Sequence, residues 1–184
     1  MHEILFSIWF FLPAGIANAV PVFAPKIKFL RVIKKPIDFG HELNKKRILG
    51  DNKTWLGLTL AVTSGLIVIL IQIIGYKHSA WIRSISGNIN YSETKIIILG
   101  PLLGFGALFG DSVESFIKRQ MGIKPGRSWF PFDQLDYIFG GLLFSSLIVQ
   151  LSLINYLIIV IVWVIIHLLG SYVGYLLGLK AKPI

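Results

Sequence analysis

The chain of 184 residues has no cysteine and few charged residues. Without cysteine it has no disulfide, no thiolate metal site and no cysteine nucleophile, so a metal ion would need oxygen or imidazole ligands. Charged residues make up 15% of the chain, well below the roughly 25% of ordinary soluble domains. Hydrophobic residues make up 54%, and the mean hydropathy is +0.72. This composition predicts an integral membrane protein.

Acidic residues are scarce as well: nine Asp and Glu stand against 18 Lys and Arg, for a formal net charge of +9. In a soluble protein such an excess would suggest nucleic acid as a partner. In a membrane protein it is explained more simply by attraction to anionic headgroups and anionic substrates, so we expect no nucleic-acid partner. The motifs G-x-S-x-G, G-x-x-x-x-G-K-[ST] and H-E-x-x-H are also missing. The sequence therefore gives no indication of a nucleophile elbow, a P-loop or a zincin site.

Long uncharged stretches predict membrane-spanning helices, because about 20 apolar residues are needed to cross the hydrocarbon core. We expect an all-α integral membrane protein of about five transmembrane helices, with two cytoplasmic loops that form the active site. Gln150, Ser152 and Asn155 are the expected turn between the last two helices. No internal repeat is evident, so residues 1–184 are expected to form a single domain. The expected spans lie near residues 4–25, 55–76, 96–117, 134–152 and 155–179, and the loops at 26–54 and 118–133.

Basic residues are concentrated on one side of these expected spans. Residues 26–53 hold nine of the 18 Lys and Arg, residues 118–127 hold four, and the tail holds Lys180 and Lys182. The loop 77–95 holds three. The positive-inside rule therefore predicts a multi-pass protein of the cell membrane, with its N-terminus outside and its C-terminus and active site in the cytoplasm.

The first span contains the run Ala17-Asn18-Ala19, which resembles a signal-peptidase site after an apolar segment. A signal peptide also has a positive n-region, whereas only Glu3 is charged before Lys26, so an uncleaved span is favoured. Asn18 is a candidate substrate contact or a packing residue. The basic and apolar stretch 26–34 that follows is expected to lie on the headgroup surface.

Four of the nine acidic residues fall within 26 residues, from Asp111 to Asp136. Ionisable residues beside a bilayer are costly to keep, so a dense cluster of both signs indicates a functional site. The basic residues between these acids are Lys118, Arg119, Lys124 and Arg127.

Asp111, Ser115 and Lys118 are spaced i, i+4 and i+7, so a helix presents them on one face, where Glu114 can pair with Lys118. A solvated helix end with a surface ion pair explains the same pattern equally well. Closely spaced glycines precede this face and predict close packing between helices: Gly100, Gly104, Gly106 and Gly110.

Asp133 and Asp136 are spaced i, i+3 at an expected helix start after Pro131, so both carboxylates can point the same way. The helix dipole alone would also favour carboxylates there. Together with Asp111 they form a set of oxygen ligands that suits Mg²⁺, which keeps several waters and binds substrate phosphates as well. We predict Asp111, Asp133 and Asp136 as the metal ligands, with Glu114 as a structural partner of Lys118.

The loop RILGDNKTW, residues 47–55, is a candidate phosphate-binding or base-binding segment. Gly50 permits a tight turn, and backbone N–H groups followed by a lysine at a helix start favour an anion. An ordinary helix cap at Thr54 is the competing explanation. The four histidines, His167 among them, have no ligand-like spacing and are expected to pack.

Five segments resemble the archaeal CDP-archaeol synthases, the archaeal branch of the phosphatidate cytidylyltransferase superfamily. The resemblance implies transfer of CMP from CTP to the ether lipid 2,3-di-O-geranylgeranylglyceryl phosphate, with release of pyrophosphate and a requirement for Mg²⁺. The segments are ANAVPVF, KPIDFG, RILGDNKTW, LLGFGALFGDSVESFIKRQMGIKPG and SWFPFDQLD, and they cover nearly the whole chain in order.

The resemblance also implies the site residues. The catalytic candidates are Asp111, Lys118, Arg119, Asp133 and Asp136. The candidates for binding CTP or the lipid phosphate are Asn18, Gly50, Asp51, Asn52, Lys53, Thr54, Ser115, Lys124 and Arg127.

Two departures from the bacterial and eukaryotic signature favour an ether lipid over an ester lipid. Lys124 is followed by Pro125 where that signature has an aspartate, and the chain has Asp-Gln-Leu-Asp at 133–136 where the signature has Asp-Arg-x-Asp. Two other functions remain as alternatives. One is a small transporter or channel, although no repeated halves are visible. The other is a different lipid-phosphate transferase, although the D-G-x-x-A-R run of the CDP-alcohol phosphotransferases is missing.

Overall fold

The computed structural model describes residues 1–23 and 35–178. The basic stretch 26–34 and the tail lysines Lys180 and Lys182 lie outside these residues. The described helices are α1 (His2–Phe23), α2 (Trp55–His78), α3 (Ala80–Ile85), α4 (Ile96–Gln120), α5 (Phe132–Ser145) and α6 (Leu153–Leu176). Two strands, β1 (Glu42–Leu43) and β2 (Lys46–Arg47), pair antiparallel in a short hairpin before α2.

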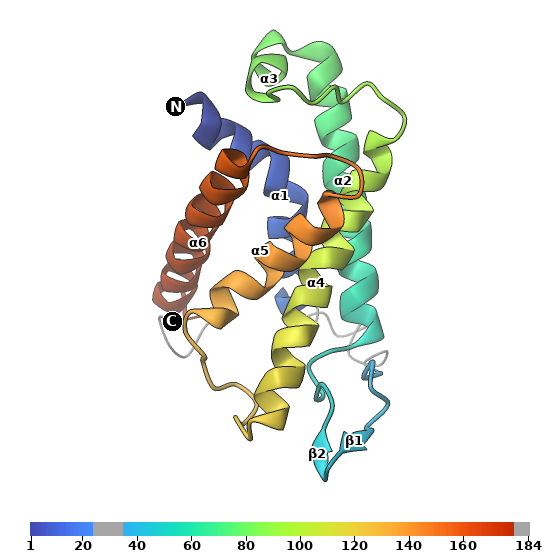
Figure 1. Ribbon diagram of the computed structural model, residues 1–184, viewed down its shortest axis with the longest axis vertical. Helices are drawn as coiled ribbons and strands as arrows, with labels where there is room; N and C mark the ends of the chain where they lie inside the picture. The colour runs from blue at the N-terminus through green and yellow to red at the C-terminus, as the bar shows by residue number, and fades with distance from the viewer. Residues whose placement is uncertain (24–34, 179–184) are drawn as a thin grey trace.

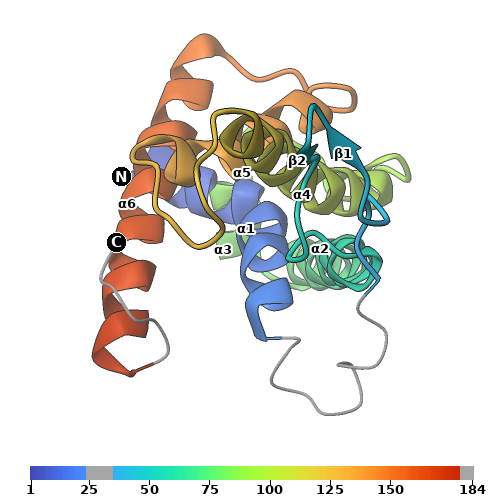
Figure 2. The ribbon, with the colours of Figure 1, turned by 90° about the horizontal axis from the view of Figure 1, so that it is seen from below.

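The helices form a bundle in which α1 lies at the centre. Helix α1 contacts α2 and α4 on one side and α6 on another, while α5 crosses α4 obliquely (Figure 1). The β hairpin and the end of α4 lie at one end of the bundle, and α3 lies at the other. Seen along the bundle, α2 and α4 lie side by side and α6 stands apart from them (Figure 2).

The core is built around the aromatic residues of α1. Phe10 and Phe11 are fully buried, and the Phe11 ring meets the ring of Trp163 from α6 edge-on. Buried polar groups reinforce this contact, because Trp163 donates from Nε1 to the carbonyl oxygen of Ser7 at 3.0 Å and Tyr137 donates to the carbonyl of Trp163 at 3.2 Å. Buried groups in a protein interior need such partners. These bonds tie α6 and α5 to α1.

Glycines let α4 approach its two neighbours closely. A side chain at Gly104 would collide with the backbone of Ala61 in α2, and one at Gly110 would collide with the carbonyl oxygen of Asp136 in α5. The close helix packing predicted from the glycine spacing is confirmed at both positions. Because Gly110 precedes Asp111, the contact with α5 also brings Asp111 next to Asp136.

The all-α membrane fold is confirmed, and the chain is a multi-pass membrane protein. Within residues 1–23 and 35–178, four helices are long and apolar enough to span a membrane: α1, α2, α4 and α6. The expected span 134–152 corresponds to α5, whose 14 residues fall short of the roughly 20 required. The turn expected around Gln150 is confirmed, with Ser152 capping α6 by accepting from the N–H of Asn155. Helix α3 and the β hairpin were not predicted, because each is too short to produce a periodic pattern.

Candidate active site

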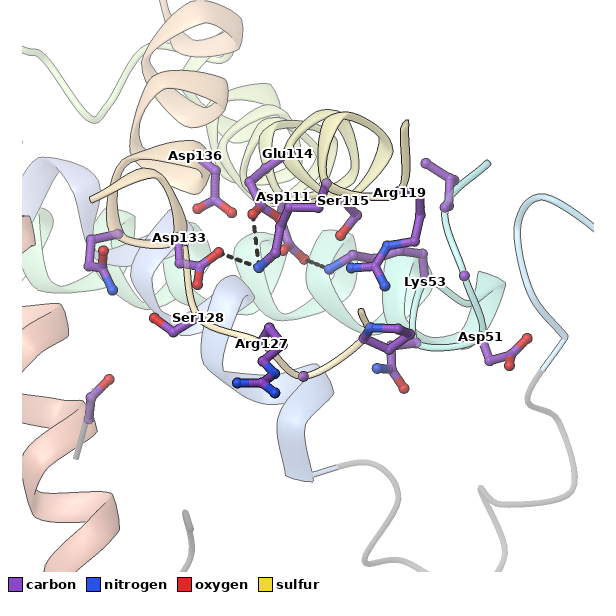
Figure 3. A pocket seen from close by; sticks show the side chains of 18 of the residues that line it. Asp51, Lys53, Asp111, Glu114, Ser115, Arg119, Arg127, Ser128, Asp133 and Asp136 are labelled. Atoms are coloured by element: carbon purple, nitrogen blue, oxygen red, sulfur yellow. Dashed lines mark hydrogen bonds and ion pairs between the residues drawn. The ribbon is translucent and has the colours of Figure 1, made fainter. Parts of the chain in front are cut away.

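A cavity of about 480 Å³ opens at the end of the bundle that carries the β hairpin. Its walls come from the loop before α2, the last turns of α4, the start of α5 with the loop before it, and α6 (Figure 3). The lining residues are Leu49, Gly50, Asp51, Asn52, Lys53, Asp111, Glu114, Ser115, Lys118, Arg119, Pro125, Gly126, Arg127, Ser128, Asp133, Gln134, Asp136, His167 and Ser171. The two segments predicted to form the active site therefore meet in one cavity.

Three carboxylates gather on one wall of this cavity. Asp111 and Glu114 project from α4 and Asp136 from α5, and one oxygen of each lies within 4.8 Å of the others. Glu114 is buried, whereas Asp111 and Asp136 are half-buried and open to the cavity. A compact set of carboxylate oxygens fits a hard divalent cation such as Mg²⁺, with substrate phosphates and water as further ligands. The residues present therefore fit a metal ion.

Asp133, a predicted metal ligand, lies beside this group instead of within it. Its Oδ1 accepts from Nζ of Lys118 at 2.7 Å, and its Oδ2 accepts from the backbone N–H of Trp129 at 2.7 Å. Glu114 takes its place in the carboxylate group. Glu114 also pairs with Lys118 at 3.0 Å, as its spacing predicted. The prediction of Glu114 as a structural partner did not place it beside Asp111 and Asp136, because the helix spacing did not show where α5 crosses α4.

Lys118 and Arg119 differ sharply in their surroundings. Lys118 is 7% exposed, and its ammonium lies between Glu114 and Asp133. Both anions are needed to offset the cost of burying that charge. In contrast, Nε and Nη1 of Arg119 are buried without a hydrogen-bond partner among the described residues. Arg119 is therefore the better suited of the two to bind a phosphate.

The loop before α2 contributes the opposite wall. Gly50 has φ of +94°, a backbone conformation that side chains rarely adopt, and this confirms the predicted tight turn. Lys53 reaches across the cavity to Asp111, with Nζ 2.5 Å from Oδ2 (Figure 3). Thr54 caps α2 by accepting from the N–H of Gly57 at 3.1 Å, as expected if Thr54 is an ordinary helix cap.

Three predicted binding residues do not line the cavity. Asn18 is half-buried on α1, Thr54 serves as the cap of α2, and Lys124 is exposed on the loop before α5. Eight lining residues were not predicted as site residues: Leu49, Glu114, Pro125, Gly126, Ser128, Gln134, His167 and Ser171. The i, i+4 spacing of His167 and Ser171 on a largely apolar helix was the available signal, since it puts both on one face.

Comparisons with known proteins agree with this geometry. A family model described as CarS-like: CDP-archaeol synthase matches residues 1–184. The chain is 34% identical over 179 residues to the CDP-archaeol synthase of Thermofilum pendens, covering 96% of this chain and 79% of that protein. It is 32% identical to the CDP-archaeol synthase of Methanocaldococcus jannaschii, covering 97% of each. A solved structure described as an intramembrane enzyme for archaeal membrane lipids biosynthesis matches with a TM-score of 0.66 and 30% identity, over 89% of this chain and 91% of that one.

Proposed function

Because the chain belongs to the CDP-archaeol synthase family, we propose that it transfers CMP from CTP to 2,3-di-O-geranylgeranylglyceryl phosphate. The products are CDP-archaeol in its unsaturated form and pyrophosphate, and the chain is an enzyme, a CTP-dependent cytidylyltransferase. The observation that best supports this chemistry is the single cavity that joins a carboxylate group to arginine nitrogens without a partner in the described part of this membrane protein. A transporter or another lipid-phosphate transferase is not favoured.

The reaction needs no nucleophile from the protein. A phosphate oxygen of the lipid attacks the α-phosphorus of CTP and forms a new P–O bond, while the bond from the α-phosphorus to the bridging oxygen of the β-phosphate breaks. Pyrophosphate leaves with that oxygen. Since both reactants are anions, the task of the enzyme is to position them and to manage their charge.

We assign Asp111, Glu114 and Asp136 as the residues that hold Mg²⁺. When bound, Mg²⁺ neutralises phosphate charge and polarises the phosphoryl oxygens. Lys118 keeps Glu114 and Asp133 in place through its two ion pairs. Arg119 and Arg127, which line the cavity, are assigned to the phosphates.

We further assign the cavity to the cytoplasmic face of the cell membrane. Basic residues are concentrated in the described segments next to it, at 35–53 and 118–127, as the positive-inside rule expects of the cytoplasmic side. CTP is soluble and enters from that side. The lipid phosphate stays in the membrane, so the cavity must be reached from both the water and the bilayer.

The test is turnover by purified protein supplied with labelled CTP, Mg²⁺ and the ether lipid phosphate. We expect CMP-lipid and pyrophosphate in equal amounts, no product when EDTA removes the metal, and recovery when Mg²⁺ is restored. Asp136→Asn should abolish turnover, whereas Glu93→Gln, which removes an exposed acid paired with Lys95, should not. Pyrophosphate release without CMP-lipid, or no reaction by the wild type, would contradict the assignment.

A further inference from the structure

Asp38 lies outside the cavity, yet its carboxylate is closely surrounded by the chain. Its side chain is 1% exposed. Four groups donate hydrogen bonds to it, two to each carboxylate oxygen. Oδ1 accepts from the N–H of Gly40 at 3.1 Å and from Nη2 of Arg47 at 2.9 Å. Oδ2 accepts from the N–H of Leu49 at 2.9 Å and from the N–H of Gly50 at 3.0 Å.

The backbone groups held by Asp38 form part of the cavity wall. Leu49 and Gly50 line the cavity, as does Lys53, which reaches Asp111. The segment around Asp38 is also joined to the far end of this loop, because the N–H of Ile37 donates to the carbonyl of Lys53 at 2.8 Å. The loop is therefore fixed at both ends by the segment that carries Asp38.

Other contacts hold the loop less firmly. The hairpin meets the end of α4 through Nζ of Lys46, which donates to the carbonyl of Gln120 at 2.5 Å, and through a long 3.5 Å bond from Gln120 to the carbonyl of Arg47. Lys46 is exposed. Bonds at an exposed site contribute little, because water competes for the same groups. The buried carboxylate is the main support of the turn at Gly50.

Only an ionised carboxylate satisfies all four donors. Burial alone would raise the pKa of Asp38, but the bonds from Leu49, Gly50, Arg47 and Gly40 outweigh it and hold that pKa well below its usual range. Asp38 therefore stays ionised above that low pKa, and its bonds are lost only as the pH falls through it. An asparagine at position 38 would turn its NH₂ group toward some of these donors and leave at least one donor without an acceptor.

We propose that Asp38 is a positioning residue that holds the loop 49–53 in the shape that binds the triphosphate of CTP. The proposal deepens the proposed function and rests on it. Asp38 does not line the cavity and so acts through the loop, without touching substrate. The expected consequence is an effect on CTP affinity that the affinity for the lipid phosphate does not share.

The test compares Asp38→Asn with wild type in CTP binding by calorimetry and in steady-state kinetics. We expect the Kd and KM for CTP to rise at least tenfold, with kcat and the KM for the lipid phosphate within about twofold, because buried hydrogen bonds to a charged group are strong. Glu42→Gln is the matched control, since it removes the same charge at an exposed position in the β hairpin that follows Asp38, and it should leave CTP binding unchanged.

A second variant separates positioning from a general loss of structure. Gly50→Ala strains the same turn through its φ of +94° without a steric clash, so it should weaken CTP binding in the same selective way. If both changes act through one loop, the double variant should weaken CTP binding by less than the product of the two single effects.

Multiplicative effects of the two changes would overturn the proposal. So would a loss of kcat or of lipid affinity in Asp38→Asn as large as the loss of CTP affinity. Failure of the proposed function is seen separately, as a wild type that binds CTP in the calorimeter but gives no CMP-lipid.

Discussion

Lys118 and Arg119 are adjacent in the sequence, but their side chains differ in the partners that surround their charges. Lys118 is buried between two carboxylates, whereas Arg119 has buried nitrogens without a partner among the described residues. Removing one member of a buried ion-pair network leaves the other charges uncompensated. Removing Arg119, for which residues 1–23 and 35–178 provide no ion-pair partner, carries no such cost.

We therefore expect Lys118→Met to lose mainly stability and Arg119→Gln to lose mainly affinity for CTP. Lys118→Met should lower the free energy of unfolding by about 3 kcal/mol or more, because Glu114 and Asp133 lose their shared partner. Arg119→Gln should unfold at the wild-type temperature or above it and should raise the KM for CTP about tenfold, the usual effect of losing a charged hydrogen bond. Thermal unfolding in detergent and steady-state kinetics on both proteins check this. Equal loss of stability in the two variants would contradict the division of roles.

Lys53 is expected to compete with a metal ion for the carboxylate of Asp111. Its ammonium lies 2.5 Å from one oxygen of a proposed metal ligand. Lys53→Met should therefore strengthen metal binding in the absence of nucleotide by a few fold, measured by calorimetry with Mg²⁺. The KM for CTP should rise, because the loop loses a cation that can turn to the phosphates. Weaker metal binding by this variant would show that Lys53 supports the carboxylate geometry instead of competing with the metal.

At the scale of the helices, the site depends on how closely α4 and α5 approach. A side chain at Gly110 would meet the carbonyl oxygen of Asp136, and one at Gly140 would meet the backbone of Gly106 and Gly110. The distance between the carboxylates of the two helices is thus set by contact between main chains. Small residues permit this approach in a membrane, where lipid gives no hydrophobic drive for helices to associate.

Gly110→Ala should push α5 away from α4 and move Asp136 out of the carboxylate group. We expect turnover to fall at least a hundredfold, since small displacements of reacting groups are costly, together with weaker Mg²⁺ binding. Gly170→Ala on α6 is the control, because no atom of the described residues lies within 4 Å of the added carbon, and it should keep wild-type activity. An active Gly110→Ala protein would mean that the helices adjust without affecting the site.

The elements could be predicted from the sequence more fully than the site. Uncharged stretches identified the long helices, and the acidic run indicated Asp111 and Asp136, which the structure brings together in the cavity, because these signals are local. The exchange of Asp133 for Glu114 depends on the angle at which α5 crosses α4, which no local pattern contains. The contribution of His167 and Ser171 depends on which face of α6 meets the cavity, and two polar residues on an apolar helix do not decide that.

In the whole molecule, the cavity lies at the end of the bundle near which the described basic residues are concentrated. The β hairpin and the end of α4 lie at the same end of the bundle, and α3 lies at the opposite end (Figure 1). The described basic segments, 35–53 and 118–127, adjoin the first of these ends. The proposed cytoplasmic orientation of the active site follows from this arrangement.

The absence of cysteine makes this orientation straightforward to test. Glu42 in the hairpin and Ser84 in α3 are both exposed and can be changed singly to cysteine in an otherwise cysteine-free chain. A membrane-impermeant maleimide should label Ser84→Cys in intact cells and Glu42→Cys only after the membrane is opened. The reverse pattern would place the active site outside the cell.

The contact between the main chains of α4 and α5 also affects how the sequence can change over evolutionary time. Where side-chain packing positions a ligand, a substitution can be compensated by a change of size in a neighbour. A backbone carbonyl allows no such compensation, since every residue type carries the same one. We therefore expect Gly110 and Gly140 to resist drift more strongly than the apolar residues around them, although neither takes part in the chemistry.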